Sequence, residues 1–461
     1  MSTSLPSPGT ELCRVTVIGP QSQADLAIPL SATVANLLPV LLQHTAQEPE
    51  RGGAWVLQRL GEPPLDADGT VDTLGLRDGD ELYLRPVDDP LPELDFDDLA
   101  DGVGDAMSRR SDLWRPQLTR RLFLGLAAFT SALLLAALAG TGAPLAAMVY
   151  AGAAALVALL ACGLIAWKLR QRDIATVTGL SGCALAALAG SLAPQVIREA
   201  ENLEALRLLF AGMALAVSAA CVLLIRKLSA AVFGTALLVG LFACLSASLI
   251  LVADASTAGS AGLVASTALV VMVAGPRLAL RLARLTGPQL PRRAEELQED
   301  IEPEQAERVL SRTDSANGFL CMFAVSSSVV ITAALTVVQR EPGWVPAALA
   351  VLFALAVFLR ARESTVIWQR LPAAGAGAVC LALVVHGGFQ GWGPLMRGVA
   401  VVTLILLAAA LLLASARLPA RRPLPIWRRT AEILETLSAL AILPLVGQLL
   451  GIYGYLRGLN G

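Results

Sequence analysis

Hydrophobic and polar residues follow two different patterns along this chain. In its first 86 residues, apolar positions alternate with polar ones or recur at helical spacing, in short segments separated by turns. From Leu122 onward the chain returns repeatedly to apolar runs of about 20 residues, the length that a helix needs to cross a bilayer. The pattern predicts a small soluble domain followed by an α-helical polytopic membrane domain.

The soluble part, residues 11–86, predicts the order β-β-α-β followed by a short element and a last strand. Two stretches between Leu12 and Leu30 alternate as strands do, and apolar residues from Val34 to Leu42 recur at helical spacing, although Pro39 interrupts them. The last strand follows an Asp-Gly-Asp turn. This α+β order, ending in LGLRDGDELYLRP, resembles the ubiquitin-like β-grasp fold. Another small α+β domain is the alternative.

The membrane part, residues 122–461, contains eleven apolar segments that predict about 11 transmembrane helices, the eighth being the shortest. The segments are Leu122–Ala139, Pro144–Trp167, Ile174–Ala193, Leu206–Ile225, Leu228–Val252, Thr257–Ala274, Phe319–Val338, Trp344–Leu359, Leu371–Val385, Gly398–Ala414 and Ala431–Leu450. With the N-terminus in the cytosol, the inner loops hold 20 Lys and Arg residues and the outer side holds five. Because cytosolic loops collect basic residues, we expect a cytosolic N-terminal domain and a periplasmic C-terminus.

Three further segments complete the predicted organisation. Residues 1–10 precede the soluble domain and are expected to be disordered, and residues 87–121 form an acidic linker that ends in a basic segment before the membrane. The linker carries eight acidic residues between Asp88 and Asp105 and no basic one. Residues 285–318 form the long cytosolic loop, in which Glu304 and Arg308 are spaced for an ion pair on a short helix.

Charge suggests where partners and lipids bind. Residues 1–108 hold five Arg and 19 Asp and Glu residues, so nucleic acid is an improbable ligand and a basic protein surface fits better. The candidate partner-docking residues are Asp78, Asp80, Asp95, Asp97, Asp98, Glu304 and Arg308. The candidate contacts with membrane headgroups are Arg109, Arg110, Trp114, Arg115, Arg120 and Arg121. For the long loop, a merely solvated helix is the alternative to a docking role.

Composition supports the membrane assignment and argues against catalysis. The chain is 55% hydrophobic and 16% charged, whereas soluble domains carry about 25% charged residues. Its seven cysteines are scattered and it has two histidines, so no metal or haem site is expected, and no other cofactor. It lacks an ATP-binding loop and a nucleophile-base pair. We therefore expect no enzyme.

Charged residues also bear on transport. Those near the apolar segments, such as Glu432 and Glu435, lie toward the predicted helix ends, and no helix centre is expected to carry a charge. Ion-coupled transport has no obvious carrier without such a residue. A stand-alone secondary transporter with a regulatory β-grasp domain nevertheless remains the alternative function.

Small residues recur four positions apart in several apolar segments. Such spacing lets two helix backbones approach closely. The candidate helix-packing residues are Gly179, Gly182, Gly190, Gly447 and Gly451. Close approach within one protomer and close approach between subunits both remain open.

Taken together, the soluble domain, the acidic linker with FDDLADGV, the stretch CRVTVIGPQSQADLAIPL and the helix count resemble the EccD family. This family is the multi-pass component of the type VII (ESX) secretion system of mycobacteria and related actinobacteria, and its N-terminal domain is YukD-like. The resemblance implies a structural scaffold in the bacterial inner membrane that forms a homodimer around a lipid-filled space. It also implies that the front domain docks the ATPase EccC, with EccB and EccE as further partners.

Overall fold

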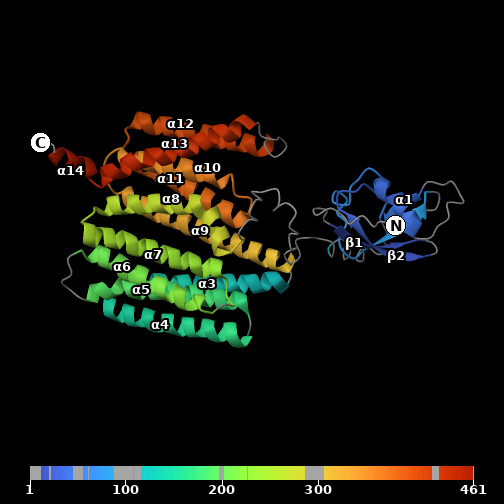
Figure 1. The fold of residues 1–461 in the computed structure, drawn as a ribbon, viewed down its shortest axis with the longest axis horizontal. Coiled ribbons are helices and arrows are strands. Elements are labelled where there is room, and N and C mark those ends of the chain that lie inside the picture. Colours follow the sequence, from blue (N-terminus) through green and yellow to red (C-terminus); the bar gives the residue numbers. More distant parts are fainter. Residues whose placement is uncertain are drawn as a thin grey trace, which may run out of the picture. The chain divides into compact units, whose positions relative to one another are not determined.

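The structure is a computed structural model that describes residues 12–19, 22–44, 55–60, 62–87, 107, 116–169, 171–196, 202–225, 227–285, 306–417 and 425–459. The chain divides into two compact units, Met1–Arg115 and Pro116–Gly461 (Figure 1).

The first unit is a four-stranded sheet with one helix. Its elements are β1 (Leu12–Ile18), β2 (Gln23–Pro29), α1 (Val34–His44), β3 (Trp55–Arg59) and β4 (Asp80–Pro86). The strand order is β2-β1-β4-β3; β1 pairs with β4 in parallel, and the two outer pairs are antiparallel. A parallel pair needs a crossover, which α1 and β3 provide between the first and last strands. The predicted ubiquitin-like fold is confirmed.

Alternating side chains of the sheet and one face of α1 form the core of this unit. Val17, Leu57, Leu82 and Leu84 are fully buried, and Leu41 of α1 is 1% exposed. The apolar positions that recur at helical spacing in α1 and alternate in β4 therefore lie in the core. Pro39 lies within α1, and the helix nevertheless continues to His44.

The second unit is a bundle of long helices that lie side by side, with α4 at one edge and α12 at the other (Figure 1). The helices are α3 (Pro116–Ala139), α4 (Pro144–Leu164), which continues as the π-helical turn η1 (Ile165–Leu169), α5 (Arg172–Val196), α6 (Leu203–Leu223), α7 (Ala230–Ala253), α8 (Thr257–Leu282), α9 (Ala306–Val338), α10 (Val345–Ala361), α11 (Ile367–Gly391), α12 (Pro394–Arg417), α13 (Pro425–Leu449) and α14 (Ile452–Leu459).

Each of the eleven predicted segments corresponds to one of the helices α3 to α13. Among the described residues, ten helices are long and apolar enough to cross a membrane, and the eleventh is the shorter α10. With 17 residues α10 measures about 26 Å, slightly less than a hydrocarbon core of about 30 Å. Leu349, Phe353 and Val357 of α10 are fully buried, so neighbouring helices shield much of it from lipid.

Several helix boundaries differ from those expected, and one helix was not expected. Helix α3 begins at Pro116, six residues before the expected start, so Arg120 and Arg121 belong to the helix. Helix α9 begins at Ala306, so the last part of the expected loop 285–318 is helical. The short helix α14 was not predicted, because its eight residues form no long apolar run.

The main core of the bundle lies between α8, α9, α10, α11 and α13. Ile331 and Leu335 of α9, Phe353 of α10 and Cys380 of α11 are fully buried there, and Ile442 of α13 is 1% exposed. Helix α12 lies outside this core, and the most apolar 18-residue stretch of the helix contains no buried residue. Lipid or another subunit must therefore cover α12, since its exposed side chains are almost entirely apolar.

Candidate docking and membrane-contact sites

The Asp78-Gly79-Asp80 turn is tied to the first strand of the soluble unit. The Asp78 Oδ1 atom accepts a hydrogen bond of 2.7 Å from the backbone N–H of Arg14. The Gly79 N–H donates 2.8 Å to the Arg14 carbonyl oxygen, and Gly79 has a φ of 91° that favours glycine. One carboxylate oxygen of the predicted docking residue Asp78 thus stabilises the contact between the turn and β1.

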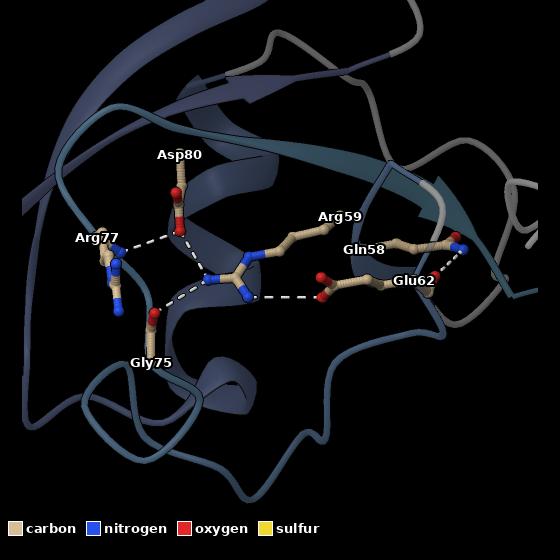
Figure 2. Close-up of polar contacts among 6 residues, drawn as sticks. All are labelled: Gln58, Arg59, Glu62, Gly75, Arg77 and Asp80. Carbon is tan, nitrogen blue, oxygen red and sulfur yellow. Dashed lines mark hydrogen bonds and ion pairs between the residues drawn. The ribbon is translucent and has the colours of Figure 1, made fainter. Parts of the chain in front are cut away.

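Asp80 is also held within the unit, by Arg59 from β3 (Figure 2). The Arg59 Nη2 atom lies 2.6 Å from Asp80 Oδ2 and donates 3.1 Å to the carbonyl oxygen of Gly75. The same Asp80 oxygen accepts 3.0 Å from the Arg77 N–H, and Arg59 Nη1 lies 3.5 Å from Glu62 Oε2. The side chains of Arg59 and Asp80 are 23% and 28% exposed. Asp80 therefore stabilises the turn, a role that its position in the sequence does not reveal.

Replacing Arg59 with Met is expected to destabilise the soluble unit. Asp80 would keep only its backbone donor, and the Gly75 carbonyl would lose the guanidinium. Loss of charge-assisted hydrogen bonds of this kind reduces the free energy of unfolding by about 1–3 kcal/mol. Hydrogen–deuterium exchange of the β3 and β4 amides in the full chain should accelerate accordingly. The matched control is Arg77→Met, because Arg77 contributes its backbone N–H to Asp80; equal acceleration in both variants would contradict this role for Arg59.

Carboxylates that remain available on the soluble unit lie elsewhere. Asp66, Asp68, Asp72 and Glu81 are exposed. The predicted docking residues Asp95, Asp97, Asp98 and Glu304 lie outside the described residues. Arg308 is exposed on the first turns of α9. Within the described structure, an acidic docking surface on the soluble unit would centre on Asp66, Asp68, Asp72 and Glu81.

Cys13 is the only cysteine of the soluble unit, and it is 3% exposed. Burial raises the pKa of its thiol above the ordinary value, and the negative charges of Asp78 and Asp80 raise it further. The thiol therefore stays protonated and unreactive at neutral pH. Among the described residues no three His, Cys, Asp or Glu side chains cluster to hold a metal ion.

Of the predicted headgroup contacts, the structure describes Arg120 and Arg121, both exposed on α3, while Arg109, Arg110, Trp114 and Arg115 lie outside the described residues. The Arg120 Nη2 atom lies 3.0 Å from Asp173 Oδ2 at the start of α5. The two side chains are 53% and 60% exposed, so this pair adds little stability in water.

Three of the predicted glycines lie between neighbouring helices of the same chain. A Cβ atom on Gly179 of α5 would lie 2.8 Å from Phe233 Cζ of α7, and one on Gly182 would lie 2.9 Å from Leu159 Cγ of α4. A Cβ on Gly190 would collide with the backbone of Phe210 in α6. Each position has space only for hydrogen.

Gly447 and Gly451 have different surroundings. A Cβ on Gly447 would make only ordinary contacts, 3.7 Å from the ring of Tyr453 in α14. Gly451 separates α13 from α14, with a φ of 72° and no atom within 4 Å of its Cβ position. Gly451 therefore allows the turn between α13 and α14, and it does not allow a close approach of two helices within the chain.

A second close approach of two helix backbones, between α6 and α7, was not predicted. Gly212 of α6 faces Gly240 of α7: a Cβ on either residue would lie 2.8 Å or 2.7 Å from the carbonyl oxygen of the other. The only sequence signal for this α6–α7 contact is the small residue Ala216, which lies four positions after Gly212. In a chain so rich in alanine this spacing is too frequent to single out one pair.

A cluster of charged residues joins α8, α10 and α13. The Arg360 Nη1 atom lies 2.6 Å from Glu363 Oε2 and 3.7 Å from Glu435 Oε1, and Nη2 donates 3.2 Å to the carbonyl oxygen of Val273. The side chains of Arg360 and Glu435 are only 18% and 16% exposed.

The position of Glu435 corrects the expectation that charges lie only at helix ends. Because α13 begins at Pro425, Glu435 is the eleventh of its 25 residues. It lies six residues, about 9 Å, inside the apolar span that begins at Arg429. Arg360 compensates its charge, since an unpaired carboxylate at this depth would be costly.

Two cavities lie among the described helices of the second unit. One, of about 500 Å³, is lined mainly by apolar side chains of α6, α7, α8 and α9, with Glu204, Arg340 and Glu341 at one end. The other, of about 710 Å³, lies between α8, α10 and α13.

Comparison with known proteins agrees with the two-unit organisation. Residues 119–459 match the family model described as the EccD-like transmembrane domain. Residues 12–84 match the family described as WXG100 protein secretion system (Wss), protein YukD.

Individual relatives match over almost the whole length. The chain is 28% identical to the ESX-4 secretion system protein eccD4 of Mycobacterium tuberculosis (strain CDC 1551 / Oshkosh), over 99% of both chains. A solved chain described as protomer 1 of the ESX-3 core complex is 19% identical, with a TM-score of 0.58 over 96% of this chain and 100% of that one. A chain of the MycP5-free ESX-5 inner membrane complex is 21% identical, with a TM-score of 0.55 over 88% of this chain and 100% of that one.

Proposed function

This chain belongs to the EccD family, and from that premise we propose that it is a structural scaffold subunit of a type VII (ESX) secretion complex in the bacterial inner membrane. The observation that carries the proposal is the pair of adjacent family matches, YukD over residues 12–84 and the EccD transmembrane domain over residues 119–459. A soluble unit joined to a multi-pass membrane unit suits a protein that holds other components at the bilayer.

The soluble unit is proposed to dock the EccC ATPase on the cytosolic side. Its net charge is strongly negative, and Asp66, Asp68, Asp72 and Glu81 are exposed. Such a surface suits a basic partner. We assign the same role to Asp95, Asp97 and Asp98 of the linker and to Glu304 and Arg308 of the long loop. Because Asp78 and Asp80 form hydrogen bonds within the unit, they contribute to docking mainly by shaping the turn.

The membrane unit is proposed to form a homodimer and to contact EccB and EccE. Support comes from α12, whose most apolar window contains no buried residue and which is therefore free to contact another subunit or lipid. Work done on exported proteins would come from the ATPase, since this chain has no ATP-binding loop.

The distribution of basic residues supports the proposed orientation, with the N-terminal unit in the cytosol. An N-terminal unit in the cytosol places 20 Lys and Arg residues on cytosolic loops and five on the periplasmic side. Eleven crossings then place the C-terminus in the periplasm.

Affinity purification of the tagged full chain from its native membrane tests the proposal. An ATPase should co-purify in mild detergent, together with other membrane subunits. Purification of the chain as an isolated subunit, without an ATPase in any detergent that preserves its fold, would contradict it.

A further inference from the structure

The cavity of about 710 Å³ between α8, α10 and α13 is a groove that opens to the outside of the helix bundle. Its walls are mainly apolar, and several lining side chains are largely exposed along its length. Val270 is 65%, Leu440 64% and Leu443 62% exposed. In a bilayer, surfaces of this kind contact acyl chains. The groove therefore has the chemistry of a site for a hydrocarbon chain.

The length of the groove suits one leaflet. Along α8 it extends from Ser266 to Arg277, eleven residues or about 16 Å. One leaflet contributes half of a hydrocarbon core of about 30 Å. A lipid whose headgroup lies beside Arg277 would extend its chain along Val273 and Val270 to the bilayer centre near Ser266.

The polar end of the groove is basic. Arg277 and Arg360 line it, and Arg281 and Arg284 continue the series beyond the groove at the end of α8. Positions 277 and 281 are four residues apart, so they share one face of α8, whereas Arg284 follows the helix end at Leu282. The carboxylates of Glu363 and Glu435 face Arg360. No ion pair joins Arg277, Arg281 or Arg284 to another side chain in the described part of the chain, and all three are exposed.

From this arrangement we propose that the groove between α8 and α13 is a binding site for an anionic phospholipid, with its phosphate at Arg277 and Arg281 and one acyl chain between the two helices. An anionic lipid fits because the exposed side chains of Arg277 and Arg281, which form no ion pair within the described residues, make the headgroup end positive. It fits better than a free phosphate or an acidic protein segment, since neither would fill the apolar length of the groove. In the orientation proposed above, the site lies in the cytosolic leaflet. The site is independent of the docking role.

Native mass spectrometry of the purified full chain, titrated with phosphatidylglycerol or phosphatidylcholine, tests the site with two kinds of variant. R277Q/R281Q removes the headgroup contacts, and A274F/A439F fills the groove without changing charge. A basic residue near an anionic headgroup contributes about fivefold to affinity, so R277Q/R281Q should weaken phosphatidylglycerol binding roughly 30-fold. A274F/A439F should weaken it at least tenfold, roughly the gain from burying two CH₂ groups.

The matched control is Arg172→Gln. Arg172 is an exposed residue of α5 at the same end of the bundle. Helix α5 lies well away from α8 and α13 (Figure 1). The control substitution should leave binding unchanged, and wild-type protein should prefer phosphatidylglycerol to phosphatidylcholine. If only R277Q/R281Q weakened binding, the ligand would need no acyl groove, and the proposal would be wrong in favour of a free phosphate or an acidic segment. Unchanged binding in both double variants, or no preference between the lipids, would also overturn it.

Discussion

Removing residues 1–105 is expected to abolish co-purification of the ATPase while the eleven membrane helices remain inserted. The first unit has its own core, formed by Val17, Leu57, Leu82 and Leu84, and the chain divides at Arg115. Deletion of the whole domain and its acidic linker therefore removes no buried side chain from the membrane unit. The truncated chain should be extracted from membranes and elute as a single species on size-exclusion chromatography. The measurement is the amount of ATPase recovered with the tagged chain, which should fall at least tenfold.

A deletion limited to residues 1–10 is the matched control, since those residues precede the sheet. It should retain the ATPase at the level of the full chain. ATPase retention by the chain that lacks residues 1–105 would place the docking surface in the membrane unit or its loops, against the proposal. Failure of the truncated chain to insert would contradict the independence of the two units.

Replacing Gly240 with Leu should strongly destabilise the membrane unit. A Cβ at this position lies 2.7 Å from the Gly212 carbonyl oxygen and 2.8 Å from the Ala216 backbone nitrogen. Backbone atoms of a helix cannot rotate away as a side chain can, so α6 and α7 would have to separate along their length. Membrane helices associate chiefly through close contact between their surfaces, since lipid is as apolar as the side chains. The expected loss of stability is roughly 3 kcal/mol or more.

The thermal unfolding midpoint in detergent, followed by size-exclusion fluorescence, measures this loss. Gly125→Leu in α3 is the matched control, because a Cβ on Gly125 has no neighbour within 4 Å. Both substitutions replace glycine with leucine inside a transmembrane helix, so helix propensity and hydrophobicity change equally. A similar decrease in both variants would show that the α6–α7 contact is not the cause.

Periodicity and chemistry along the chain were sufficient to predict the fold. Alternation in β1 and β2 and the helical spacing of Val34, Leu37 and Leu41 identified the buried faces, because each depends on residues close together in sequence. The eleven apolar segments were identifiable for the same reason. Helix ends were less predictable: α13 extends six residues before its apolar run, which moves Glu435 well inside the helix.

The roles of individual side chains depended on contacts between distant segments. Asp80 was predicted to be a docking residue because it is acidic and lies in a turn. Its partner Arg59 is 21 positions away, and nothing in the sequence relates the two. Arg360 and Glu435 are likewise 75 positions apart in the sequence, and the packing of α10 against α13 brings them together. Among the glycines, spacing identified Gly179 and Gly182, but the same spacing could not distinguish the Gly212–Gly240 contact from many alanine-rich alternatives.

We propose that this chain holds a cytosolic docking domain at one end of a membrane unit that crosses the bilayer eleven times. Site-directed labelling tests it most directly, with single reporter cysteines at the N-terminus, in the loop of residues 286–305 and after Gly461, in an otherwise cysteine-free chain. A membrane-impermeant thiol reagent added to intact cells should label only the C-terminal site, and all three sites should react after the membrane is opened. Protection of the C-terminal site in intact cells, together with its labelling from the cytosolic side, would give an even number of crossings and contradict this orientation.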